Sequence, residues 1–115
     1  MNPLPPASRR LEGAETVFTL SLEPDLPACR GHFPGDPVVP GVVQVDWAIR
    51  LGEAAFGPLG GFAGLEHLKF LAPLRPGAEV ELRLALAPAR DRLSFQYAGA
   101  AGRQSSGQVR FHPAP

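Results

Sequence analysis

One short stretch combines residue types that can move protons. Residues 31–41 read GHFPGDPVVPG, so His32 stands in a loop that contains three prolines and three glycines. Proline and glycine favour tight turns, and such a loop would hold an imidazole in place rather than leave it mobile. Histidine titrates near neutral pH and can therefore act as a general base or acid. This makes His32 the first candidate catalytic residue.

A carboxylate follows fourteen residues later, in an apolar run. Asp46 lies within residues 42–56, where apolar residues surround most of a helical projection and Gly57-Pro58 marks the end. At the start of such a helix, the backbone N–H groups of Gly41 and Val42 would lack intrahelical acceptors and carry partial positive charge. They are candidates for binding a carbonyl oxygen as it becomes an oxyanion. Together these groups could move a proton next to a carbonyl.

Each of these residues also has a structural interpretation. A histidine in a proline-rich loop usually serves packing or turn geometry. Asp46 could form an ion pair with Arg50 one helical turn later, and Phe33 and Trp47 are of types more often found in cores than in ligand sites. Residue types alone therefore predict a candidate site without naming a substrate.

The rest of the pattern predicts strands around this helix. The expected strands cover residues 16–22, 64–71, 80–86 and 93–97, with a short last strand at 108–111 after a loop at 102–107. The proline-rich residues 24–40 should be irregular. Residues 1–13 read as a flexible tail and 14–115 as one domain. The expected fold class is α+β, a curved antiparallel sheet wrapped around one long central helix.

Composition narrows the class of protein. The 115 residues suit a single domain, and eleven basic residues balance eleven acidic ones, which argues against nucleic-acid binding by bulk positive charge. Cys29 is the only cysteine, so neither an intrachain disulfide nor a cysteine zinc site can form. Neither a secretory signal nor a membrane-spanning apolar run is evident. We expect a cytoplasmic protein that binds neither nucleic acid nor membrane.

The run GHFPGDPVVPGVVQVDWA, residues 31–48, resembles the signature of the β-hydroxyacyl-acyl-carrier-protein dehydratases, the FabA/FabZ-like branch of the hotdog superfamily. That signature is HFxGxPxxPG followed by a helix that carries a carboxylate. A weaker match is KFLAPLRPG at residues 69–77, which is similar to a strand and turn of the family. The segment VVQVDWA, residues 42–48, is similar to the corresponding segment of small stand-alone dehydratases from polyene-type lipid or pigment clusters.

The resemblance implies a hotdog fold, a homodimer or larger assembly with shared active sites, and an acyl carrier protein as partner. The implied reaction removes water from a 3-hydroxyacyl thioester on phosphopantetheine and leaves a trans-2-enoyl thioester, without metal or redox cofactor. His32 would be the base, and Asp46 of the other subunit would protonate the departing hydroxyl. The amides of Gly41 and Val42 would bind the thioester oxygen. The remaining expected substrate contacts are Phe33, Pro40, Trp47 and Arg50.

Two alternatives stay open at this stage. A hotdog acyl-thioesterase would hydrolyse the thioester, although the intact HFPG loop counts against it. A non-catalytic hotdog subunit paired with an active partner is favoured by Arg50, since the family commonly has glutamine there. The Asp-x-Asn-x-x-His pattern of MaoC-type hydratases is absent. Carrier docking should use arginines, and the candidates are Arg9, Arg10, Arg30 and Arg75; His67 and His112 receive no role.

Overall fold

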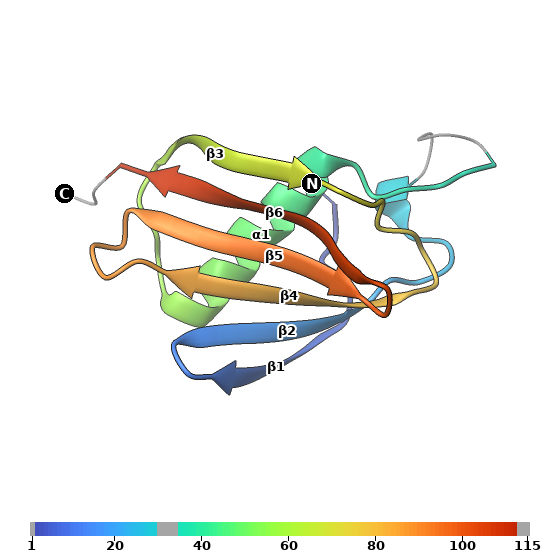
Figure 1. Cartoon of the computed structure of the whole chain (residues 1–115), viewed down its shortest axis with the longest axis horizontal. Coiled ribbons are helices and arrows are strands. Elements are labelled where there is room, and N and C mark those ends of the chain that lie inside the picture. The colour runs from blue at the N-terminus through green and yellow to red at the C-terminus, as the bar shows by residue number, and fades with distance from the viewer. Residues whose placement is uncertain (1, 30–34, 113–115) are drawn as a thin grey trace.

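The computed structural model describes residues 2–29 and 35–112 and shows six strands and one long helix. The elements are β1 (Ala7–Glu12), β2 (Glu15–Ser21), a 3₁₀ turn (Pro27–Cys29), α1 (Gly41–Phe56), β3 (Phe62–Phe70), β4 (Glu79–Leu86), β5 (Arg92–Gly99) and β6 (Gly102–Phe111). The strands form one antiparallel sheet in the order β1-β2-β4-β5-β6-β3, with α1 lying across it (Figure 1). The predicted α+β architecture is confirmed.

The helix is buried on one side rather than all round. Val43, Trp47 and Leu51 follow one another at intervals of four residues and are at most 8% exposed, and α1 packs on β4 and β5. Val42, by contrast, is 77% exposed. The bulky Trp47 ring sits against the sheet because that placement removes the largest apolar area from water. Among the described residues, no helix has the length and apolar character needed to cross a membrane.

The core side of the sheet follows the predicted alternation. Every second residue of β4 and β5 is buried: Val80, Leu82, Leu84, Leu93, Phe95 and Tyr97. Their neighbours point to the other face of the sheet and are partly exposed. This alternation confirms the predicted central strands. In the strand order, β1 and β3 are the two edges of the sheet.

The expected tail over residues 1–13 is wrong, because residues 7–12 form the edge strand β1. It pairs with β2 along its whole length, from Ala7 opposite Leu20 to Glu12 opposite Glu15. Gly13 in the connecting turn has φ +61°, a conformation that favours glycine. The strand has no apolar pattern because most of its side chains are exposed, so backbone hydrogen bonds rather than buried side chains hold it.

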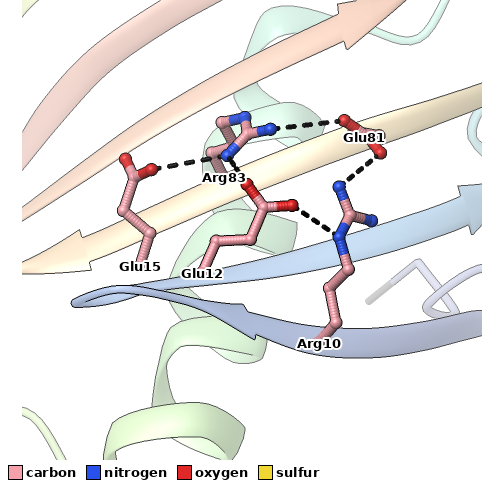
Figure 2. Close-up of polar contacts among 5 residues, drawn as sticks. All are labelled: Arg10, Glu12, Glu15, Glu81 and Arg83. Atoms are coloured by element: carbon pink, nitrogen blue, oxygen red, sulfur yellow. Dashed lines mark hydrogen bonds and ion pairs between the residues drawn. The ribbon is translucent and has the colours of Figure 1, made fainter.

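An outer ion-pair cluster also ties β1 to the sheet (Figure 2). Its members are Arg10, Glu12, Glu15, Glu81 and Arg83. Arg10 lies 2.6 Å from a Glu12 oxygen and 2.9 Å from a Glu81 oxygen, and Arg83 bonds the other Glu12 oxygen at 2.8 Å. These arginines, Arg83 before Arg10, lower the pKa of Glu12. Exposed pairs contribute little individually, so the cluster assists the backbone pairing rather than replacing it.

The last strand is longer than expected, since residues 102–107 belong to β6 rather than to a loop. Glycine and serine there suggested a loop, but they serve packing. A Cβ on Gly107 would lie 2.6 Å from a Leu68 methyl carbon, and Ser105 is fully buried with a hydrogen bond to Gln44. Small residues are needed because side chains from neighbouring elements occupy the space above them.

Candidate functional site

The proposed base, His32, lies outside the described residues, as does Phe33, so the roles of both stay predictions. The structure does describe the chain on either side. Before them, the Cys29 amide donates to the Leu26 carbonyl at 3.0 Å. After them, the Val39 amide donates to the Leu74 carbonyl at 2.8 Å. Both flanks are therefore hydrogen-bonded within the domain.

The helix begins where the sequence predicted. Pro40 is the residue before α1, and its carbonyl accepts hydrogen bonds from the amides of Val43 and Gln44 at 3.0 and 3.1 Å. The amides of Gly41 and Val42 precede these donors and have no acceptor within the helix, as in any first helical turn. Within the described residues they have no acceptor, so they can bind an oxygen that approaches the end of the helix.

An open, largely apolar groove of about 530 Å³ lies at this helix start. Its lining comprises Val38, Val39, Pro40, Gly41, Gln44, Phe70, Leu71, Ala72 and Pro73. A Cβ on Gly41 would stand 2.8 Å from the tip of the Phe70 ring. Glycine therefore lets the ring lie against the helix start, where a larger side chain would collide with it. Pro40 and Gly41 are the two predicted site residues that line the groove.

Gln44 is a site residue that sequence reasoning missed. It is 3% exposed, and its amide donates to the Val39 carbonyl at 3.0 Å while accepting from the Ser105 hydroxyl at 2.6 Å. The Tyr97 hydroxyl donates to the Gln44 backbone carbonyl at 2.7 Å. These bonds join the loop before α1, the helix itself and two strands. The available signal was a lone polar residue on an otherwise apolar helix face.

The Tyr97 hydroxyl is held neutral by its surroundings. Burial raises its pKa well above the ordinary value, and the negative charge of Asp46 raises it further. A neutral phenol keeps its proton for the bond to Gln44. The network thus fixes the first turns of α1, where Gly41 lines the groove.

Replacing Gln44 with leucine should destabilise the domain by about 2 kcal/mol or more, because it leaves the buried Ser105 hydroxyl and the Val39 carbonyl unpaired. The expected fall in melting midpoint is roughly 5–10 °C, measured by differential scanning calorimetry. Gln96→Leu is the matched control, since Gln96 faces the other side of the sheet and should change stability by less than about 0.5 kcal/mol. Equal shifts in both variants would contradict the network's role.

Asp46 is more exposed in this chain than its apolar sequence context suggested. Its side chain is 42% exposed, and one carboxylate oxygen lies 3.3 Å from a guanidinium nitrogen of Arg50. The ion pair that the sequence left open is therefore present. Arg50 is 26% exposed, and the same nitrogen also donates to the Asn2 carbonyl at 2.7 Å.

Asp46 and the groove lie on different sides of the helix. Two helical residues rotate by about 200°, so Asp46 projects nearly opposite to Gln44, which lines the groove. Asp46 does not line the groove. A single chain therefore does not bring this carboxylate to the groove that its own Gly41 lines.

Trp47 is a core residue rather than the substrate contact that we expected. It is 0% exposed, and its indole N–H has no hydrogen-bond acceptor within the described part of the chain. Its position on the sheet-facing side of α1 explains the difference, because a large ring there contributes more by packing. Val42 keeps its predicted place at the helix start, with an exposed side chain and an available amide.

The curved sheet and the helix across it define a hotdog protein. Thioesterase superfamily member 2 from Mus musculus shares this fold with a TM-score of 0.71 at 9% identity, over 94% of this chain and 82% of that one. The model of the ApeI-like family, described as ApeI dehydratase, matches residues 8–108. The chain belongs to this family, and the FabZ-like dehydratase resemblance is confirmed.

Two relatives support this assignment. The dehydratase heterocomplex ApeI:P from Xenorhabdus doucetiae contains a chain 31% identical to this one, with a TM-score of 0.83 over 92% of this chain and 96% of that chain. The 3-hydroxyacyl-[acyl-carrier-protein] dehydratase FabZ of Erythrobacter litoralis is 35% identical over 81 residues, or 63% of this chain and 53% of FabZ. The chain thus spans about half the length of that curated relative.

Proposed function

We propose that this protein removes water from a 3-hydroxyacyl thioester carried on an acyl carrier protein and releases a trans-2-enoyl thioester. The observation that carries the proposal is the helix start, where Gly41 lines an apolar groove and the amides of Gly41 and Val42 have no acceptor within the helix. An acyl chain suits the apolar walls, and a thioester oxygen suits the amides. Membership of a dehydratase family supports the same reaction.

The proposed reaction consists of two proton transfers. His32 takes the proton from the carbon next to the thioester carbonyl, and the electron pair moves onto the carbonyl oxygen. The amides of Gly41 and Val42 stabilise the negative charge on that oxygen. The electron pair then returns from the oxygen to form the carbon–carbon double bond, the carbon–oxygen bond to the hydroxyl breaks, and Asp46 supplies the proton that makes water. The proton on His32 then returns to Asp46 through solvent, so neither a metal nor a redox cofactor is required.

A homodimer is proposed because β3 offers a pairing surface. This strand is an edge of the sheet, and most of its residues are exposed. The exposed apolar side chains along it and just after it are Phe62, Leu65, Leu68, Phe70 and Leu71, with 38–61% exposure. An exposed apolar edge strand readily pairs with another strand. A second copy could extend the sheet and cover these side chains.

Such a dimer would support shared active sites. The groove of one subunit would meet Asp46 of the other, which agrees with the opposite directions of Asp46 and Gln44 on α1. ApeI:P is described as a heterocomplex, so a related but different hotdog subunit is the competing partner. Light scattering of the purified protein separates these cases, because a homodimer forms from this chain alone.

Three of the four arginines considered for carrier docking already have partners. Arg10 belongs to the outer ion-pair cluster, Arg75 pairs with Asp36, and Arg9 donates to the Ala54 carbonyl. Arg30 lies outside the described residues. Arg9 is the described member of the set that contacts no carboxylate in this chain. It is therefore our first choice among them for contact with an acidic carrier.

Incubation of the pure protein with a 3-hydroxyacyl carrier protein tests the function. We expect mass spectrometry of the carrier to show loss of one water from the acyl group. Release of a free acid would instead indicate a thioesterase. An unchanged acyl group with tight carrier binding would indicate a non-catalytic subunit. Asp46→Asn is the control for contaminating activity, because it should abolish the reaction while leaving the fold unchanged.

A further inference from the structure

Arg50 connects the proposed acid to a distant part of the chain. One guanidinium nitrogen donates both to the Asp46 carboxylate, at 3.3 Å, and to the Asn2 backbone carbonyl, at 2.7 Å. About three quarters of the Arg50 side chain is buried. A guanidinium that binds only a carboxylate on its own helix can keep that contact while both side chains change rotamer. A second, distant acceptor removes that freedom.

The Asn2 carbonyl can serve as an anchor because its segment is itself held. We call residues 2–6 the N-terminal strap. Pro5 within it is buried, and the Pro6 carbonyl accepts a hydrogen bond from the Ser21 amide at 3.0 Å. The strap continues directly into β1, and Figure 1 shows the chain running from β1 toward α1. Three prolines, Pro3, Pro5 and Pro6, also restrict the backbone of the strap.

We propose that Arg50 is a positioning residue for Asp46, with the N-terminal strap as its support. This inference rests on the proposed function, because it assumes that Asp46 acts in the dehydration. It replaces the expectation that Arg50 contacts substrate, since the guanidinium nitrogen nearest the carboxylate is already engaged twice. Proton delivery depends on the direction in which the carboxyl group of Asp46 points, so a loosened Asp46 should slow turnover without weakening substrate binding.

The test compares Arg50→Met with a variant that lacks residues 2 and 3, which removes the Asn2 carbonyl but keeps Pro5. We expect each change to lower kcat by about 10-fold with KM within about two-fold of the parent. The combined variant should be no slower than either alone, because both changes break one chain of contacts. Arg50→Lys should restore part of the lost kcat, since lysine keeps a donor but not the planar fork.

Arg90→Met is the matched control. Arg90 also ties a distant part of the chain to the end of α1, through the Phe56 and Pro58 carbonyls at 3.0 and 3.1 Å, but does not contact Asp46. It should leave kcat with a saturating substrate unchanged. A rise in KM without a fall in kcat in Arg50→Met would overturn the inference and restore a substrate contact. Full activity in Arg50→Met would overturn it as well. If Asp46→Asn were itself fully active, the proposed function of Asp46 would fail instead.

Discussion

Replacing His32 with alanine should lower the rate of dehydration by at least about 100-fold while leaving the fold intact. The α-proton of a thioester is weakly acidic, so its removal needs a base held close to it. Alanine removes the base without adding bulk. The other parts of the proposed site, the amides of Gly41 and Val42 and the apolar groove, stay in place. Steady-state kinetics with a 3-hydroxyacyl carrier protein measures the loss, and circular dichroism checks the fold.

His67→Asn is the matched control for this experiment. His67 lies on β3 with a side chain that is 73% exposed, and its φ of +56° is one that asparagine tolerates well. It should retain full activity. Equal losses in both variants would point to a general effect of removing histidine. An unchanged rate in His32→Ala would remove this residue from the mechanism, whatever the fate of the other predicted groups.

Mixing two inactive variants should restore activity if the sites are shared between subunits. A dimer of one His32→Ala chain and one Asp46→Asn chain has one site with both native groups and one site with neither. Random pairing of equal amounts makes half of the dimers mixed, so about a quarter of the wild-type activity should return. Refolding the two variants together, or expressing them together with different tags, allows the exchange.

The same mixture gives a different result if each chain carries a complete site. Every site would then lack one group, and activity would stay at the level of the single variants. Co-purification of the two differently tagged variants supplies the control for exchange, because only a mixed dimer carries both tags. The exposed β3 edge and the opposite directions of Asp46 and Gln44 are the structural reasons to expect recovery.

The parts of the fold that were predicted well are those whose side chains alternate between core and solvent. β4 and β5 show an alternation of apolar and polar residues, and α1 shows an apolar run. Each pattern reflects which side of one element is buried, so it can be seen directly in the sequence. The two ends of α1, at Gly41 and Gly57, could also be predicted from the sequence, because proline and glycine end helices for local steric reasons.

The parts that were missed depend on contacts between distant residues. The edge strand β1 is stabilised by its backbone hydrogen bonds to β2. Its side chains are mostly exposed, so they show no pattern from which this pairing could be predicted. The start of β6 was read as a loop because Gly107 and Ser105 are small or polar, although Leu68 on β3 and Gln44 on α1 require them to be so. Packing between elements overrode the local preference in both cases.

For the candidate site, residue types and spacing were enough to single out His32, the amides at Gly41 and the carboxylate of Asp46. They also sufficed for the family resemblance, because turn geometry, helix ends and the types of acid–base residues depend on residues that lie close together in the sequence. The directions in which side chains point came only from the folded chain. Trp47 turned into the core, Arg50 was occupied by Asp46 and Asn2, and Gln44 joined three elements. Each of these outcomes depends on which distant backbone happens to lie within hydrogen-bonding or packing distance, and folding alone brings those segments together.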